Sequence, residues 1–218
     1  MTGAARGLGA TIATRLREGG YAVVGADLVS TELTLDVREP AGWAAAARAL
    51  EGAGEPWALV NCAARTLVRD FFAIEPEEWD DVLAVNLRGP FLGIREVGRT
   101  LAAHGGGRIV NISSDAAYKG FGATGAHYAV SKAGLLTLTR RAAAALAAEH
   151  VTVNAIAPGT IDGETVRELA DPVAEAAAAP TGRLVDPDGI ASLVAWLLSD
   201  AAADTTGSVF RIDGGTSL

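Results

Sequence analysis

The chain has 218 residues, half of them hydrophobic, and a formal net charge of −8 at pH 7. That length fits one α/β domain over residues 1–218, and an acidic chain without a long run of Lys or Arg argues against nucleic acid or an anionic membrane as a partner. No apolar run reaches the roughly 18 residues that a membrane span needs, and the one cysteine, Cys62, cannot form an internal disulfide, so we expect a cytoplasmic protein whose partners are small molecules.

A glycine-rich turn opens the chain and leads into a predicted helix. The sequence TGAARGLG places Gly3, Gly7 and Gly9 before the amphipathic stretch ATIATRLREGG. Glycine permits positive φ and close approach of the backbone, and a helix N-terminus offers free N–H groups to a pyrophosphate. The pattern alone fits an ordinary tight turn equally well.

Six short β-rich runs then alternate with longer helical stretches. The runs are YAVVGAD, LTLDV, WALVN, RIVNISS, VTVNAIAP and GSVFRID. Continuous hydrophobicity, as in ALV and RIVNI, is typical of strands covered on both faces in a parallel sheet. The pattern therefore predicts a doubly wound, mostly parallel α/β fold. Residues 29–33 leave too little chain for a crossover helix between the first two runs, so we expect an abbreviated link there.

Asp27 ends the first run and bears on the choice of cofactor. A carboxylate at this position can accept hydrogen bonds from the ribose hydroxyls of an adenosine and would repel a 2′-phosphate, which favours NAD over NADP. Arg6 favours NADP, because a guanidinium beside the phosphate turn could bind a 2′-phosphate. We give Asp27 more weight, since it should lie directly at the adenosine ribose.

The stretch HYAVSKAGLLTL places Tyr128 and Lys132 four residues apart at the start of a predicted helix, on one face. A free phenol titrates near pH 10, so proton transfer at neutral pH asks for a downward shift of about 3 units, or roughly 4 kcal/mol. An ammonium about 4 Å away contributes on the order of 4 kcal/mol at an effective dielectric constant near 20. We therefore expect Lys132 to lower the pKa of Tyr128.

Taken in order, these motifs resemble the short-chain dehydrogenase/reductase family over almost the whole chain. The matching pieces are TGAARGLG, Asp27, LDV, NCAA, VNLRG, IVNISS, YAVSK, VNAIAPG and RIDGG. The resemblance implies a sheet of order 3-2-1-4-5-6-7 and a homotetramer or homodimer. It also implies a catalytic tetrad, with Tyr128 as acid/base, Lys132 as its activator and a ribose ligand, Ser114 as a donor to the substrate carbonyl, and Asn86 as the holder of a relay water.

The same resemblance assigns further residues. Ser113 competes with Ser114, but the family uses the later serine of such a pair. Pro158-Gly159 should lie against a nicotinamide, where glycine removes side-chain bulk. The expected cofactor-binding residues are Gly3, Arg6, Gly7, Leu8, Gly9, Asp27, Asp36, Val37, Asn61, Ala63, Tyr128, Lys132, Pro158 and Gly159. No set of His, Cys and carboxylate residues has metal-ligand spacing, so we expect no metal site.

The main departure from the family pattern is the first strand. Family members have a hydrophobic strand before the glycine turn, whereas here only Met1 precedes Thr2. That strand is central in the expected order, and its absence would leave backbone groups unsatisfied at about 1–3 kcal/mol each. We therefore expect that the polypeptide begins further upstream or that another segment fills the slot.

These observations predict an NAD(H)-dependent oxidoreductase that interconverts a secondary alcohol and a ketone, with residues 160–183 as a substrate loop or lid. One alternative is an NADPH-dependent reductase of the 3-oxoacyl type. Another is a non-catalytic protein that senses a dinucleotide, which the tetrad disfavours because a sensor needs no proton donor.

Overall fold

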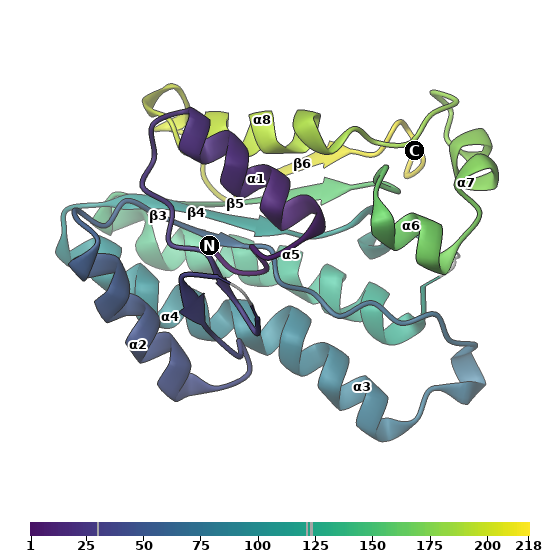
Figure 1. Ribbon diagram of the computed structural model, residues 1–218, viewed down its shortest axis with the longest axis horizontal. Helices are drawn as coiled ribbons and strands as arrows, with labels where there is room; N and C mark the ends of the chain where they lie inside the picture. Colours follow the sequence, from purple (N-terminus) through teal and green to yellow (C-terminus); the bar gives the residue numbers. More distant parts are fainter. Residues whose placement is uncertain (30, 121, 123) are drawn as a thin grey trace.

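Parallel strands alternate with helices along the chain (Figure 1). This computed structural model describes residues 1–29, 31–120, 122 and 124–218. Its strands are β1 (Ala26–Asp27), β2 (Leu33–Thr34), β3 (Ala58–Asn61), β4 (Gly107–Ile112), β5 (Val151–Pro158) and β6 (Val209–Ile212). Its α-helices are α1 (Gly7–Glu18), α2 (Pro40–Gly52), α3 (Pro76–Leu83), α4 (Gly89–Ala103), α5 (Ala126–Leu146), α6 (Glu164–Leu169), α7 (Pro172–Ala178) and α8 (Pro187–Leu197). Short helical turns are η1 (Phe71–Ala73), η2 (Ala84–Arg88), η3 (Asp115–Ala117), η4 (Ala147–Glu149) and η5 (Asp200–Ala202).

The strands form two parallel groups. One sheet has the order β3-β4-β5-β6, with Val60 opposite Val110 and Val110 opposite Asn154, and β1 pairs with β2. Every residue of β4 and β5 is buried, as expected for strands covered on both faces. The predicted α/β fold is confirmed. The link between β1 and β2 contains no helix among its described residues, and residue 30 within it lies outside them.

Met1 and Thr2 lie between β1 and β3, where the first strand was expected. Thr2 bridges to Ala26, the Thr2 N–H donates to the carbonyl of Val60 over 3.0 Å, and the Ala26 N–H donates to Met1 over 2.8 Å. Met1 and Thr2 thus occupy the position of the first strand, over two residues. The predicted strand over 21–27 is correspondingly short, because only its last part has a partner, and β1 comprises just Ala26–Asp27.

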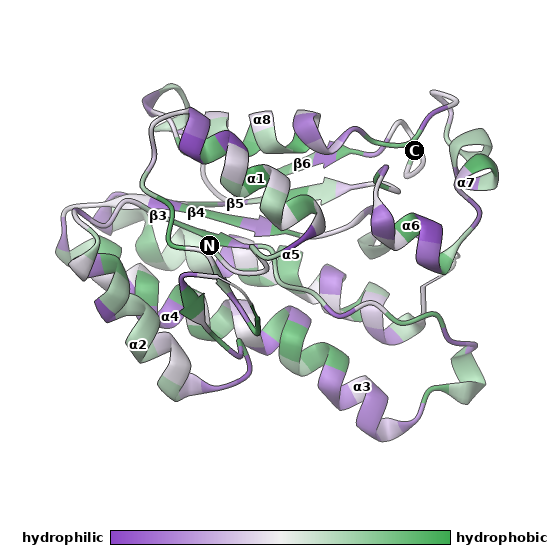
Figure 2. Cartoon of the chain, viewed as in Figure 1, coloured by the Kyte–Doolittle hydropathy of each residue, from purple (hydrophilic) through white to green (hydrophobic). Residues whose placement is uncertain are grey.

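Helices cover both faces of the sheet (Figure 1). On one face, Ile109 and Val153 pack with Trp43 of α2 and Leu101 of α4. On the other face, α1 and α8 cover Val60, Val110 and Ile156 with residues such as Ile12 and Ile190. Figure 2 shows hydrophobic and hydrophilic bands alternating along α1, as expected for an amphipathic helix with one face on the core.

The predicted helices after the glycine turn and around Tyr128 are present as α1 and α5. Just before Gly89-Pro90 the chain forms the π-helical turn η2, which contains Asn86 and leads directly into α4. None of the helices in the described ranges is both long and apolar enough to cross a bilayer.

Candidate active site

The glycine turn is tightly packed except at one position. A Cβ on Gly9 would lie 1.8 Å from the carbonyl oxygen of Gly3, and a Cβ on Gly3 would lie 2.7 Å from the amide nitrogen of Ala63. Gly7, with φ of +54°, has nothing within 4 Å of its Cβ position and begins α1. Arg6 caps this helix without a side-chain hydrogen bond, so the first N–H groups stay available to a diphosphate.

Asp27 lies at the end of β1, beside this turn. Its Oδ2 accepts the N–H of Ala5 over 3.1 Å, and its Oδ1 accepts the N–H of Leu28 over 2.7 Å. A carboxylate has about four acceptor positions, so capacity remains for two ribose hydroxyls. Arg6 is the N-cap residue of α1, at the end of the glycine turn, and it is exposed. These residues fit the adenosine half of a nicotinamide dinucleotide.

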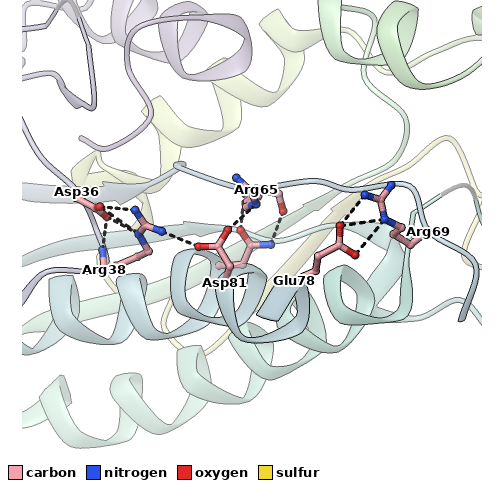
Figure 3. A network of polar contacts seen from close by, with 7 residues as sticks. Asp36, Arg38, Arg65, Arg69, Glu78 and Asp81 are labelled. Carbon is pink, nitrogen blue, oxygen red and sulfur yellow. Dashed lines mark hydrogen bonds and ion pairs between the residues drawn. The ribbon is translucent and has the colours of Figure 1, made fainter. Parts of the chain in front are cut away.

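Asp36 belongs to a row of ion pairs that Figure 3 shows along α3. Both oxygens of Asp36 accept from the guanidinium of Arg38, which lowers the pKa of the Asp36 carboxyl. Arg38 also donates to Asp81 of α3 over 2.6 Å, and Asp81 pairs with Arg65 over 2.7 Å. The row therefore ties the segment after β2 to the segment after β3.

Three predicted cofactor contacts have side chains that face the core instead. Val37 is buried, and its Cγ2 lies 3.0 Å from the Cβ position of Gly89. Leu8 packs against the cluster around Ile12. Asn61 donates to Asn111 over 2.8 Å inside the protein. The structure does not bring these three side chains to the site, which leaves only their backbone groups for a cofactor.

Ala63 lies at the site through its backbone. Its N–H and that of Cys62 both donate to the hydroxyl of Thr2, over 3.2 and 3.1 Å. Thr2 thereby fixes the end of β3 against the glycine turn. Sequence reasoning did not assign this role to Thr2, although its place next to Gly3 was visible.

Tyr128 and Lys132 meet at the start of α5. The Lys132 Nζ lies 5.6 Å from the centre of the Tyr128 ring, and it donates to the carbonyl oxygen of Ile112 over 2.8 Å. Lys132 is 2% exposed, and burial lowers the pKa of its ammonium to about 8. The predicted proximity of the two groups is present.

The expected effect of Lys132 on the phenol is wrong for the protein alone. Burial raises the pKa of Tyr128 above its ordinary value, although hydrogen bonding with the hydroxyls of Ser114 and Thr66 lowers it in part. The expectation assumed an ammonium about 4 Å from the phenol oxygen. Lys132 instead points to the carbonyl of Ile112, so Tyr128 is a protonated acid in the free protein.

The two candidate serines have different surroundings. Ser113 is buried and donates to the backbone carbonyl of Lys132 over 2.9 Å. The Ser114 hydroxyl lies near the phenol of Tyr128, donates to Asp115 over 3.3 Å and accepts the N–H of Ala116 over 3.2 Å. The geometry therefore supports Ser114 and gives Ser113 a structural role.

Asn86 uses its amide to hold the surrounding backbone. Its Nδ2 donates to the carbonyl of Arg65 over 2.9 Å and to Ser131 over 3.1 Å, and its Oδ1 accepts the N–H of Arg65 over 2.8 Å. Both amide hydrogens are thus engaged. The expected relay water would have to bind elsewhere, such as at a backbone carbonyl of the π-helical turn.

Gly159 packs closely against Asp213. Its Cβ position lies 2.9 Å from the Cα of Asp213, which belongs to the segment after β6. The buried Pro158-Gly159 corner thus packs against the protein on this side, and the contact of these two residues with a nicotinamide stays a prediction. Thr160, the next residue, donates to Glu175 of α7 over 2.7 Å.

Comparison with known proteins agrees with this geometry. A family model described as enoyl-(acyl carrier protein) reductase matches residues 3–217. The chain belongs to the short-chain dehydrogenase/reductase family. The chain is 36% identical to the short-chain reductase protein NovJ of Streptomyces niveus, covering 99% of this chain and 92% of that protein. It is also 36% identical to the 3-oxoacyl-[acyl-carrier-protein] reductase FabG of Vibrio cholerae, covering 99% and 95%.

The fold of the chain is likewise that of its family. A short-chain type dehydrogenase/reductase from Mycobacterium marinum matches it with a TM-score of 0.95 at 28% identity, covering all of this chain and 94% of that one. The chain is thus an oxidoreductase of a family that uses nicotinamide dinucleotides. Within residues 1–29, 31–120, 122 and 124–218, no three His, Cys, Asp or Glu side chains are grouped to hold a metal ion.

Proposed function

We propose that this protein interconverts a ketone and a secondary alcohol, with Tyr128 as the acid/base. The observation that carries the proposal is the position of Tyr128, whose phenol lies near the Ser114 hydroxyl and whose ring centre lies 5.6 Å from the buried ammonium of Lys132. A protonated phenol is the form that gives a proton to a ketone oxygen. Ser114 would donate a hydrogen bond to that oxygen, and Asn86 would keep the backbone around Arg65 in place. A bound nicotinamide would supply or accept the hydride.

The reaction is tested by measuring turnover on two substrate sets, 3-oxoacyl thioesters and simple ketones or secondary alcohols. We expect activity with at least one set, and substrate preference identifies the class. The name of the Vibrio cholerae relative favours a second candidate, an NADPH-dependent 3-oxoacyl-type reductase. Dinucleotide binding without turnover on either set would instead favour a non-catalytic sensor.

For the cofactor we propose NAD, because the carboxylate of Asp27 stands at the end of β1 beside the glycine turn. Replacing Asp27 with Asn keeps the shape but removes the charge. We expect kcat/KM with NAD to fall about tenfold and kcat/KM with NADP to rise, since a 2′-phosphate is no longer repelled. Steady-state kinetics with both cofactors measure the change.

Replacing Arg6 with Ala is the matched control for this prediction. If the protein uses NADP, this variant and not Asp27→Asn will lose activity, because the guanidinium would be the group that binds the 2′-phosphate. That outcome would assign the protein to the NADPH-dependent candidate.

We also propose that residues 160–183 act as a substrate lid and that the protein forms a homodimer or homotetramer. This segment carries α6 and α7, and inside it the hydroxyl of Thr160 donates to Glu175 of α7. Phe91 and Val130 are each 46% exposed. Phe91 also lines a surface hollow of about 620 Å³ over α3, η2, α4 and α5. Light scattering in solution would measure the number of subunits in the assembly.

A further inference from the structure

A buried carboxylate lies directly behind the Ser114 hydroxyl. Asp115 follows Ser114 in the turn η3 and is 7% exposed, and its Oδ1 accepts the Ser114 O–H over 3.3 Å. Burying a charge costs free energy unless partners compensate it. The partners of Asp115 therefore determine where this carboxylate points.

Two groups from outside the turn η3 hold the other oxygen of Asp115. The ammonium of Lys119 donates to Oδ2, and the hydroxyl of Thr216 donates to the same oxygen over 2.8 Å. Thr216 comes from the segment after β6, 101 positions further along the chain. The direction of the carboxylate, and with it the direction of the Ser114 O–H bond, is thus fixed from outside the serine's own turn.

The Ser114 hydroxyl has a single proton, and without a substrate oxygen the acceptors that compete for it are the carboxylate of Asp115 and the oxygen of an ionised Tyr128. While the proton is donated to Asp115, the Ser114 oxygen can only accept a hydrogen bond from the neighbouring phenol of Tyr128. If Tyr128 ionises, the Ser114 proton must turn away from Asp115 to stabilise the phenolate. Ionisation of the phenol therefore costs the hydrogen bond to Asp115.

We propose that Asp115 is a positioning residue, which holds the Ser114 hydroxyl beside Tyr128 and opposes negative charge on the phenol, while Lys119 weakens that opposition by neutralising the carboxylate. The inference rests on the proposed function, because it takes Tyr128 as the group that exchanges the proton. Asp115 would act through its neighbours and without touching the substrate.

Three other titratable groups lie around Tyr128. Lys132 lies on the same helix, and Cys62 comes from the segment after β3. The charges of Asp115 and a Cys62 thiolate both raise the pKa of Tyr128, but burial raises the pKa of the Cys62 thiol to about 11, so it is neutral at pH 7. His127 is buried, and its Nδ1 accepts the backbone N–H of Tyr128. Asp115 with Lys119 is therefore the charge pair that substitution can test.

Two substitutions should move the pH dependence in opposite directions. Asp115→Asn removes the negative charge, so the phenol should lose its proton more easily. The midpoint of the alkaline limb in the pH profile of ketone reduction should therefore move about 0.5–1 pH unit lower. Lys119→Met leaves the carboxylate uncompensated, so the same limb should rise by a similar amount. Thr216→Val removes one donor to Asp115 and should give a smaller rise. The measurement is kcat/KM against pH for each variant.

A purely structural role would not produce shifts of opposite sign. Asp200→Asn changes one exposed charge by Arg108, at the opposite end of β4 some 20 Å away by strand length, and should shift nothing. Equal shifts for Asp115→Asn and Lys119→Met, or none in either, would overturn the proposal.

A second readout needs no substrate. Fluorotyrosine, whose phenol is more acidic, can be incorporated and its ionisation followed by fluorine NMR, with Tyr128→Phe to assign the signal. Opposite shifts of that signal without turnover would support the role of Asp115 and reject the proposed reaction. Turnover with an unmoved signal would keep the reaction and reject the role of Asp115.

Discussion

Replacing Tyr128 with Phe is expected to lower kcat about 10²–10⁴-fold, the range that a single general acid or base contributes. Phe keeps the ring that packs near Lys132 but removes the hydroxyl that would give its proton to the substrate oxygen. Because most of the expected cofactor contacts come from other residues, the dissociation constant of the dinucleotide should change little. Single-turnover measurements of hydride transfer, combined with cofactor titration, separate the two effects.

Tyr118→Phe is the matched control for this variant. Tyr118 ends the turn η3, is 46% exposed, and its ring lies 5.7 Å from the guanidinium carbon of Arg211. Removal of this hydroxyl should leave kcat within about twofold of the parent protein, since surface substitutions usually have small effects. Equal rates in the parent and in Tyr128→Phe would show that the phenol is not the acid.

Sequence periodicity predicted the parts of the fold that depend on local pattern. The amphipathic stretch after Gly9 became α1, and the continuous apolar runs ALV and RIVNI became parts of the buried strands β3 and β4. The length of β1 could not be predicted in the same way. A strand exists only where a neighbour pairs with it, and Met1 and Thr2 offer just two residues.

In the site, too, the spacing of residues in the sequence predicted which residues lie close together, but not the direction in which their side chains point. Spacing of four residues placed Tyr128 and Lys132 together, but it could not say that the long side chain of Lys132 reaches the carbonyl of Ile112. Which way Asn61 points is decided by Asn111, fifty positions along the chain, and no local pattern contains that information. Asp115 was overlooked for the same reason, because its partner Thr216 is distant in sequence.

The second large effect concerns Lys132, whose replacement by Met should abolish activity and stabilise the fold near neutral pH. Burial lowers the pKa of this ammonium from the ordinary 10.5 to about 8. That pKa difference corresponds to a free-energy cost of roughly 3 kcal/mol for burying the charged ammonium at pH 7. Met fills a similar volume without the charge, but it leaves the carbonyl of Ile112 unpaired at about 1–3 kcal/mol.

The expected net gain for Lys132→Met is about 0–2 kcal/mol at pH 7, or a rise in Tm of up to about 8 °C for a chain of this size. The gain should depend on pH. Between pH 8 and 10.5 the unfolded chain binds the proton of Lys132 more tightly than the folded protein does, so the parent protein becomes more stable as pH rises through this window. The advantage of the variant should therefore shrink and disappear by about pH 10.5.

Urea unfolding at several pH values would measure this difference. The thiol of Cys62 titrates with the opposite sign, because its pKa is raised to about 11, but it does so in both proteins and largely cancels in the comparison. Lys119, the only other lysine in the chain, is the control. Its ammonium compensates the buried Asp115, so Lys119→Met should destabilise the protein at pH 7. A loss of stability in both variants would mean that the Lys132 charge costs the fold nothing, and that its bond to Ile112 decides the balance.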